Sequence, residues 1–459
     1  MLITPQQLCF FTNAEKARMP SEKHDEKTEW GTFKDSLKAP IHSWFTYPAG
    51  FSYKAVESSF KAHHITSGDT IYDPFMGSGT TNLVAKKLGI HSYGVEAHPF
   101  VFKIARAKLQ WEIDRDEILH ALSQIEHFVH AHKKQPRSRS TQDVLHNEFP
   151  ELLLKCYEDD TLLELLWIRN ALNTIQLSQE SYDFFFVGLT GLLREVSSAA
   201  TGWPYIAPNK KKTTSANKIP LTEFRRQMYK MLEDIRLMIS EAIPTYSDSQ
   251  HHLFNADSRD VTDLVTDKSI DHIFTSPPYL NNFDYADRTR LELYFFGEAN
   301  TWGDISQQIR TKLMTSATTQ ISRNDLRYTL SEDLRQACPD VYVHLKEAIQ
   351  VLSERRLHKG GKKSYDLLVT GYFNDMYCEL KEAFRVLKPG RSAVFVLGDS
   401  APYGVHIPTD EFIGKIGRGL GFSDYHITVL RERGGKWGEN PQRHKVKLKE
   451  SIVTLTKYP

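Results

Sequence analysis

The sequence predicts an α/β protein built on a doubly wound, mostly parallel sheet, with large, mainly helical insertions and a C-terminal antiparallel strand pair. Three observations support this fold class. Residues 69–111 read as strand, glycine turn, helix, strand ending in an acid, and helix. Strand patterns return only after residue 250, beyond a long, charged helical stretch. Two β-prone runs, 425–430 and 451–456, follow the last helical pattern around a charged turn.

In the first unit, Asp69–Asp73 is a short β-prone run that ends in a glycine turn. Thr80–Leu88 has apolar residues at helical spacing, and Gly89 suits the C-terminus of that helix. His91–Glu96 reads as the second strand and His98–Trp111 as the second helix. This succession of elements opens a parallel sheet in which a strand and a helix alternate.

The later elements complete the sheet. We expect strands at 252–257, 269–275 and 392–397, and helices at 372–387 and 411–420, the first of these two ended by Lys388-Pro-Gly390. The predicted organisation is an N-terminal arm (1–40), a catalytic domain (41–110 and 250–459), a helical insertion (111–249) and a second insertion within the catalytic domain (284–363). The helical patterns within the first insertion run over Leu152–Leu177 and Ser181–Arg194.

Composition limits the class of protein. At about 150 residues per domain, the 459 residues fit three domains or one large α/β domain with insertions. Lys plus Arg number 58 and Asp plus Glu 57, so a basic surface for nucleic acid must be local. The four cysteines are far apart and favour a reducing compartment. Without a long apolar run or a signal-peptide pattern, we expect a cytoplasmic protein with no membrane partner.

The glycine turn Asp73-Pro-Phe-Met-Gly-Ser-Gly-Thr-Thr81 predicts a nucleoside site. Gly77 and Gly79 allow a tight turn and a close approach of ligand to backbone. Glu96, at the tip of the second strand, is placed to accept hydrogen bonds from ribose hydroxyls. The turn lacks the Gly-Lys-Ser/Thr of a triphosphate loop, and Asn82 replaces the third glycine of a dinucleotide fingerprint. A nucleoside without pyrophosphate fits better, and S-adenosylmethionine (SAM) is the candidate.

A second motif, Thr275-Ser-Pro-Pro-Tyr279, follows another strand of the same sheet. Two prolines fix the backbone, so the carbonyl of Pro277 points rigidly into the site. Ser276 adds a hydroxyl acceptor, and Tyr279 offers a flat face for stacking. Two acceptors and an aromatic ring can orient an exocyclic amine on a planar base that has been turned out of a duplex.

With these two motifs the sequence resembles the amino-methylating DNA methyltransferases of the Ser-Pro-Pro-Tyr type, which transfer a methyl group from SAM to N4 of cytosine or N6 of adenine. The resemblance implies the Rossmann-like fold of SAM-dependent methyltransferases. Carried over by position, it implies that the catalytic residues are Ser276, Pro277, Pro278 and Tyr279. It implies that SAM is bound by Phe51, Asp73, Phe75, Gly77, Ser78, Gly79, Thr80, Glu96 and Asp257.

In this family Ser-Pro-Pro-Tyr goes mostly with cytosine N4, and Asp- or Asn-Pro-Pro-Tyr mostly with adenine N6. The resemblance therefore implies a site-specific enzyme that methylates N4 of cytosine in duplex DNA by base flipping. The implied setting is a restriction–modification or related defence system, with a cognate endonuclease or defence proteins as possible partners. The alternatives are adenine N6 methylation, an RNA amino-methyltransferase on the same fold, and a non-catalytic nucleic-acid-binding module regulated by SAM.

The chain ends directly after its last strand, so we expect the target to be recognised by the insertions. The basic run Lys210–Lys212, preceded by the aromatic segment 201–205, is the main candidate for phosphate contacts, although such a run can also be a solvated surface. Arg288 and Arg290 could reach the DNA backbone or pair with Glu292, and the segment 281–285 could extend the base pocket. Arg137 and Arg139 are less distinctive candidates.

A group of histidines in the first insertion resembles a metal site only superficially. Their spacing places them along one helix face beside acidic residues, which is common for surface or core histidines. We therefore expect no metal. The members are His120, His127, His130 and His132.

Overall fold

A computed structural model describes residues 30–46, 50–134, 140–200, 206–212, 218–321, 328–359, 362–433 and 446–459. Three sequence-based expectations lie outside the described residues: the arm before residue 30, the basic pair Arg137 and Arg139, and the aromatic segment 201–205. No helix in the part of the chain that the structure describes is long and apolar enough to cross a membrane.

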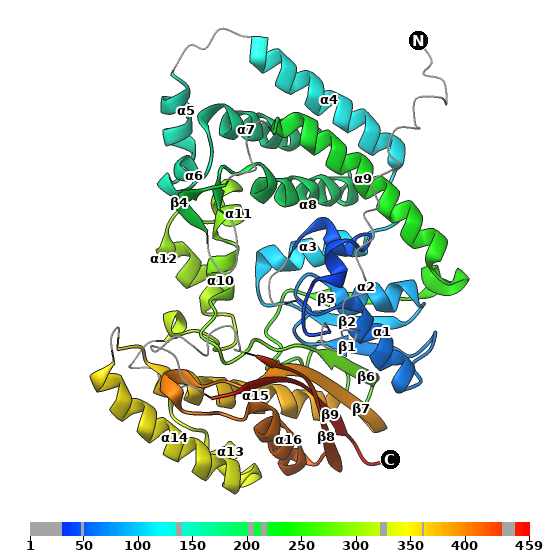
Figure 1. Ribbon diagram of the computed structural model, residues 1–459. Coiled ribbons are helices and arrows are strands. Elements are labelled where there is room, and N and C mark those ends of the chain that lie inside the picture. The colour runs from blue at the N-terminus through cyan, green and yellow to red at the C-terminus, as the bar shows by residue number, and fades with distance from the viewer. Residues whose placement is uncertain are drawn as a thin grey trace, which may run out of the picture.

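The main sheet of the described chain has seven strands in the order β5-β2-β1-β6-β7-β9-β8 (Figure 1). The first five are parallel, and β9 runs antiparallel to both β7 and β8. The predicted fold class, a mostly parallel α/β sheet with a C-terminal antiparallel pair, is thus confirmed. The bounds are β1 Thr70–Asp73, β2 His91–Val95, β5 His251–Phe254, β6 Ile270–Thr275, β7 Leu387–Gly398, β8 Asp424–Arg433 and β9 Leu448–Thr456.

Successive residues of the central strands point to opposite faces, and each face is covered by helices. Ile71 of β1 packs into a core with α1 and α2, whereas Tyr72 packs into a core with α14, α15 and α16. Both side chains are almost fully buried, as expected for a parallel sheet covered on both sides. The bounds are α1 Tyr53–Ala62, α2 Thr80–Lys87, α3 Pro99–Leu109, α13 Glu332–Ala337, α14 Pro339–His358, α15 Tyr365–Val386 and α16 Thr409–Leu420.

The insertions form a helical body beside the sheet (Figure 1). Helices from both insertions share one hydrophobic core, which also includes buried side chains of α3. The bounds are α4 Arg115–Lys134, α5 Thr141–Glu148, α6 Glu151–Cys156, α7 Asp159–Thr174, α8 Gln179–Val196, α9 Pro220–Glu241, α10 Tyr285–Arg288, α11 Arg290–Phe295 and α12 Trp302–Ile305. A small hairpin of β3 (Ala199–Ala200) and β4 (Ala207–Lys211), which the sequence did not predict, joins α8 to α9.

One buried ion pair connects the two insertions. The Arg194 guanidinium on α8 donates to both carboxylate oxygens of Glu292 on α11, at 2.5 and 2.9 Å, and to the carbonyl of Arg288 at 2.6 Å. The side chain of Glu292 has no exposed surface. The sequence suggested Arg288 or Arg290 as the partner of Glu292, but the structure gives this role to Arg194, while Arg290 lies 3.1 Å from Asp287.

Some element boundaries differ from the sequence prediction. Helix α15 begins at Tyr365, seven residues before the predicted start, because the buried face continues through Leu368 and Val369. The predicted helical run 152–177 is divided into α6 and α7 by extended backbone at Tyr157 and Glu158. The described end of the predicted arm also packs onto the protein, since Phe33 is only 8% exposed and Ser36 fully buried.

Candidate active site

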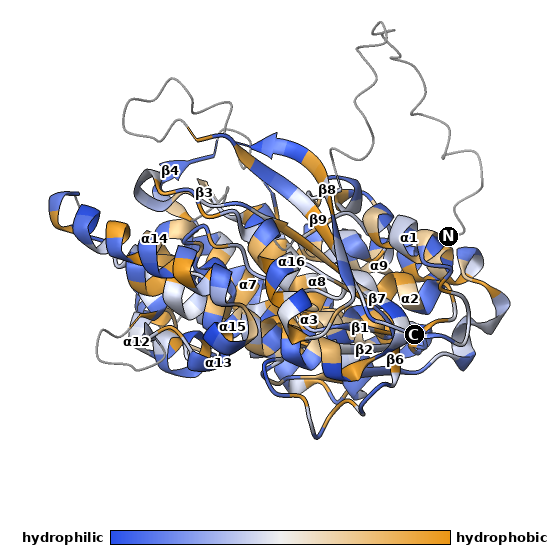
Figure 2. Ribbon diagram, turned by 90° about the horizontal axis from the view of Figure 1, so that it is seen from below, coloured by the Kyte–Doolittle hydropathy of each residue, from blue (hydrophilic) through white to orange (hydrophobic). Residues whose placement is uncertain are grey.

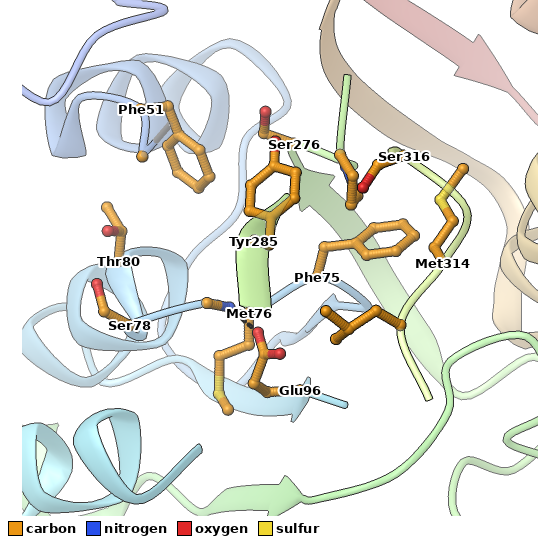
Figure 3. A pocket seen from close by; sticks show the side chains of 14 residues that line it. Phe51, Phe75, Met76, Ser78, Thr80, Glu96, Ser276, Tyr285, Met314 and Ser316 are labelled. Carbon is orange, nitrogen blue, oxygen red and sulfur yellow. Dashed lines mark hydrogen bonds between the residues drawn. The ribbon is translucent and has the colours of Figure 1, made fainter. Parts of the chain in front are cut away.

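A cleft of about 660 Å³, including its open mouth, lies at the carboxyl ends of β1, β2 and β6 (Figure 3). This is the sheet edge at which open α/β proteins bind ligands. Residues from five separate segments line it. They are Gly50, Phe51, Phe75, Met76, Gly77, Ser78, Thr80, Glu96, Ser276, Pro278, Tyr285, Leu313, Met314 and Ser316.

The glycine turn has the backbone conformation that its glycines were predicted to permit. Gly77 has φ of 54° and Gly79 has φ of 87°, in the left-handed region that other residues rarely adopt. Gly79 is also the N-cap of α2, so the turn passes directly into the first turn of the helix. A Cβ at Gly79 would lie 3.3 Å from the side chain of Leu109, so α3 packs closely behind the turn.

Glu96 lies directly after β2, beneath the glycine turn. Its two carboxylate oxygens accept hydrogen bonds from the backbone N–H of Gly77 at 2.9 Å and of His98 at 2.7 Å. These bonds fix the carboxyl group on the wall of the cleft. Burial raises the pKa of Glu96 to about 7, although the two backbone donors oppose this shift.

Asp73, at the end of β1, connects the glycine turn to the second motif. Its Oδ1 accepts from the backbone N–H of Phe75 at 3.1 Å and from the hydroxyl of Thr275 at 2.6 Å. The side chain is fully buried, and burial raises its pKa to about 6. Asp73 is not among the residues that line the cleft. In this structure it therefore holds two loops together, and the cleft is lined by the residues of those loops.

The second motif presents Ser276 and Pro278 to the same cleft. The Ser276 hydroxyl donates to the carbonyl of Val396 on β7 at 2.9 Å, which leaves its oxygen able to accept from a ligand. The Tyr279 hydroxyl donates to Oε1 of Glu450 on β9 at 2.8 Å. Burial, followed by the nearby Glu450 carboxylate, raises the pKa of Tyr279 well above its usual range, so the phenol stays protonated.

One wall of the cleft comes from the second insertion, and motif matching did not find it. Leu313, Met314 and Ser316 line the cleft from one loop. Figure 3 shows Met314 and Ser316 on the same side of the cleft as Phe75. The amide of Gln320 organises this loop: its oxygen accepts from the backbone N–H of Ser316 and Ala317 at 2.8 Å each, and its nitrogen donates to the carbonyl of Met314 at 2.9 Å. The sequence offers no signal for this wall, since the loop has no recognisable motif.

The same loop is attached to the residues that follow the second motif. Thr318 donates to Oδ1 of Asn282 through its backbone N–H at 2.8 Å and through its hydroxyl at 2.9 Å. Thr319 donates to Asp284, the N-cap of α10, at 2.8 Å. Tyr285, the first residue of α10, projects into the cleft, so the predicted extension of the pocket by residues 281–285 has a structural counterpart (Figure 3).

The structure brings most of the predicted site residues together. Those that line the cleft are Phe51, Phe75, Gly77, Ser78, Thr80, Glu96, Ser276 and Pro278. Those outside the lining are Asp73, Gly79, Asp257, Pro277 and Tyr279. Among these, Asp257 has both carboxylate oxygens hydrogen-bonded by Arg259, at 2.6 to 3.1 Å. The cleft residues Gly50, Met76, Leu313, Met314 and Ser316 were not predicted.

The residues predicted to contact DNA divide into two groups. Lys210 and Lys211 are exposed on β4, where Lys211 lies 3.1 Å from Glu158. Lys212 donates to the carbonyl of Arg194 at 2.5 Å, and Arg288 is only 7% exposed. Lys212 and Arg288 would have to leave these positions to reach a phosphate.

Comparison with known proteins indicates the family. A family model described as DNA methylase, of the N6/N4 methyltransferase class, matches residues 12–107, which include the glycine turn and Glu96. Type II methyltransferase M.BsoBI of Geobacillus stearothermophilus is 27% identical over 447 residues, covering 91% of this chain and 86% of that protein. The chain is similar to amino-methylating DNA methyltransferases.

Other relatives of the methyltransferase also align along nearly its whole length. Type II methyltransferase M.AvaI of Anabaena variabilis is 26% identical over 446 residues, covering 93% of this chain and 88% of that protein. Type II methyltransferase M.MvaI of Kocuria varians is 20% identical over 434 residues, covering 90% and 87%. Because these matches cover about nine tenths of the chain, the aligned sequence includes residues of both insertions.

Proposed function

We propose that this DNA methyltransferase transfers the methyl group of SAM to the N4 amine of cytosine in duplex DNA. The observation that carries the proposal is that the glycine turn and the Ser-Pro-Pro-Tyr motif, about two hundred residues apart, line one cleft. The resemblance of Ser276–Tyr279 to the motif found mostly with cytosine N4 supports cytosine over adenine. Adenine N6 and an RNA substrate are the competing possibilities on the same fold.

The cleft fits SAM as its ligand. Glu96 keeps lone pairs on both oxygens beside its two backbone bonds, and these can accept from the ribose hydroxyls. Phe51, Phe75 and Pro278 provide apolar walls for the adenine and methionine parts. Bound SAM would supply the methyl group on a sulfonium, and the deeply placed carboxyls of Glu96 and Asp73 favour a cation in this region.

The chain's own residues would orient the target amine. The oxygen of Ser276 and the carbonyl of Pro277 each accept one N–H of the cytosine amine, so the nitrogen lone pair points at the methyl carbon. The N–C bond forms as the C–S bond breaks, and the nitrogen then loses one proton. Tyr279, held by Glu450, would stack on the base after it leaves the duplex. The cost of unstacking would be offset by phosphate contacts.

The exposed lysines of β4 are the described candidates for those contacts. Figure 2 shows the β3–β4 hairpin and the free ends of β8 and β9 on the same side of the molecule. Lys210 is exposed on that hairpin, and Lys447, just before β9, has a side chain that is 82% exposed. A duplex placed along this side could reach both. A cognate restriction endonuclease is the partner we propose, because the relatives are Type II methyltransferases.

Product analysis tests the proposal. DNA from cells that express the chain is digested to nucleosides and the methylated product identified by mass, and the modified positions are mapped by sequencing. N4-methylcytosine at a fixed sequence supports the proposal. N6-methyladenine alone would assign the chain to the adenine group, and tight DNA binding without any methylated nucleoside would favour a SAM-regulated binding module.

A further inference from the structure

The ring of Tyr279 is covered by an arginine. The guanidinium carbon of Arg433, the last residue of β8, lies over this ring, 5.4 Å from its centroid. The ring also packs against the hydrophobic core that includes α15 and β7, and its hydroxyl is held by Glu450. Tyr279 is therefore rigid, and the guanidinium occupies a position on the ring where a stacked base would have to lie.

The guanidinium of Arg433 packs against the end of β7, at Gly398. A Cβ added at Gly398 would lie 2.3 Å from Nη2 of Arg433 and 2.6 Å from Cζ. Any larger residue at this position would therefore displace the arginine. Nη2 donates to the carbonyl of Asp399 at 2.5 Å, and Nε donates to the carbonyl of Lys449 at 3.3 Å. The absence of a side chain at Gly398 is what lets the guanidinium lie against β7.

Arg433 differs in its partners from Arg431, two residues earlier on the same strand. Arg431 donates to Oε2 of the buried Glu450 at 2.5 Å and so has a carboxylate partner. Within the residues that the structure describes, no carboxylate lies within 4.0 Å of the Arg433 guanidinium. Moving Arg431 away would leave the buried Glu450 carboxylate without its counter-charge, whereas moving Arg433 away leaves only neutral carbonyls, so Arg433 exchanges partners more easily. Arg433 is thus the arginine of this strand that can move to a ligand.

We propose that Arg433 reads the target base. It rests on Tyr279 while DNA is absent, and when cytosine takes the ring face the guanidinium turns to the edge of the base and donates to O2 and N3. A planar fork of donors matches two adjacent acceptors, and cytosine has two beside N4. On the edge that pairs in a duplex, adenine has only N1 beside N6, followed by a C–H, so there it can use only one donor of the fork. The inference rests on the proposed cytosine specificity and names the residue that would produce it.

A pair of substrates tests this assignment. Two duplexes carry the target sequence mapped above, one with cytosine and one with 3-deazacytosine, which keeps O2 and the N4 amine but replaces N3 by a C–H. The ratio of kcat/KM on the two duplexes is measured for the native protein and for Arg433→Met, which keeps an unbranched apolar stem and removes all donors. Arg236→Met, which makes the same substitution at an exposed position of α9 away from the cleft, is the matched control.

We expect the native protein and Arg236→Met to favour cytosine over 3-deazacytosine strongly. Arg433→Met should lose about 10- to 100-fold of that preference, which is the discrimination given by a bidentate contact to a base. Gly398→Ala, which displaces the guanidinium, should lose part of the same preference. Thermal unfolding shows whether each variant is folded.

Two results would overturn the assignment. In the first, Arg433→Met keeps the native preference. In the second, it lowers kcat/KM equally on both duplexes and weakens the salt dependence of DNA binding, which is the behaviour of a phosphate contact. Failure of the proposed function looks different, because the native protein would then yield no N4-methylcytosine from the cytosine duplex. The native product is therefore identified before the variants are compared.

Discussion

The hydroxyl of Thr275 donates a 2.6 Å hydrogen bond to Oδ1 of Asp73, and this buried contact joins two motifs that are 202 positions apart in the chain. Asp73 ends β1 and begins the glycine turn, and Thr275 ends β6 and precedes Ser276. The two strands are parallel neighbours, so their carboxyl ends meet at one edge. The sheet pairing and this bond therefore fix the distance between the glycine turn and Ser276.

Replacing Asp73 tests whether the carboxyl group acts as an acceptor between the two loops. Asp73→Ala leaves the Phe75 N–H and the Thr275 hydroxyl without this partner, at a cost of about 1–3 kcal/mol for each buried group. Asp73→Asn keeps an acceptor oxygen and is the control. We expect Asp73→Ala to lose stability in urea unfolding and affinity for SAM in calorimetry, and Asp73→Asn to lose little of either. Equal effects of both variants would show that the charge matters and the bonds do not.

Truncating Tyr279 tests its assignment to the target base. In Tyr279→Ala we expect most turnover to be lost while the Kd for SAM changes little, because the ring is outside the cofactor cleft. Base–aromatic stacking is worth about 1–3 kcal/mol per base, which bounds the loss from stacking alone. Tyr279→Phe keeps the ring but not the bond to Glu450, and should retain more activity than the alanine variant. A Kd for SAM that rises as steeply as turnover falls would place Tyr279 at the cofactor instead.

The raised pKa of Glu96 predicts a pH dependence of SAM binding. Burial raises it to about 7, so the carboxyl in the ligand-free protein is largely protonated below that pH and ionised above it. An ionised carboxylate accepts hydrogen bonds from ribose hydroxyls more strongly, so the Kd for SAM should fall as the pH rises from about 6 to about 8. Glu96→Gln should bind more weakly above pH 7 and lose most of this dependence. Titration calorimetry at constant ionic strength measures both, and an unchanged slope in the variant would remove Glu96 from the cofactor site.

The raised pKa of Glu96 also affects the stability of the folded protein. Stability should decrease as the pH rises, whereas the affinity for SAM should increase. An acid whose folded-state pKa is raised makes the folded protein less stable once it ionises. For Glu96 this loss develops as the pH rises from its unfolded value of 4.5 to about 7. Glu96→Gln should therefore gain stability relative to the native protein across this interval. Urea unfolding at both ends of the interval tests it, and a difference that shrinks with rising pH would contradict the assigned shift.

Replacing Gln320 tests whether its amide holds the loop that forms one wall of the cleft. Gln320→Ala removes the bonds to Ser316, Ala317 and Met314, so residues 313–316 should lose their fixed position beside Phe75. We expect a higher KM for SAM with a smaller change in kcat. The exposed Gln308, in the same insertion, gives the control variant Gln308→Ala. A KM that stays at the control value would mean that the loop is held by its other contacts.

Replacing Glu292 tests how much its ion pair with Arg194, which connects the two insertions, contributes to stability. Because its side chain is fully buried against Arg194, Glu292→Ala leaves a guanidinium without its carboxylate, a change that typically costs about 3–5 kcal/mol. We expect a large decrease in the free energy of unfolding. The surface pair Arg236–Glu233 provides the control variant Glu233→Ala, which should change stability far less because the pair is exposed to water. Similar values for the two variants would show that the Arg194 guanidinium finds water or another partner.

The sequence alone determined the fold class, the positions of the strands that carry the motifs, and most of the cleft on the cofactor side. This was possible because a glycine turn, a strand-end acid and a proline-rigidified loop act through local backbone geometry, which is written in consecutive residues. Phe75, Gly77, Glu96 and Ser276 follow from such local patterns, and the structure places all four around one cleft.

The tertiary structure decided what depends on contacts between distant segments. It shows that Asp73 connects two loops and is not among the residues that line the cleft. It also shows that Met314 lines one wall of the cleft and that Glu292 pairs with Arg194. It also placed Arg433 over Tyr279, a contact that requires the missing side chain of Gly398 on a third strand. Such contacts have no sequence signature, because each depends on which side chains the packing of the sheet and the insertions happens to bring within a few ångströms of each other.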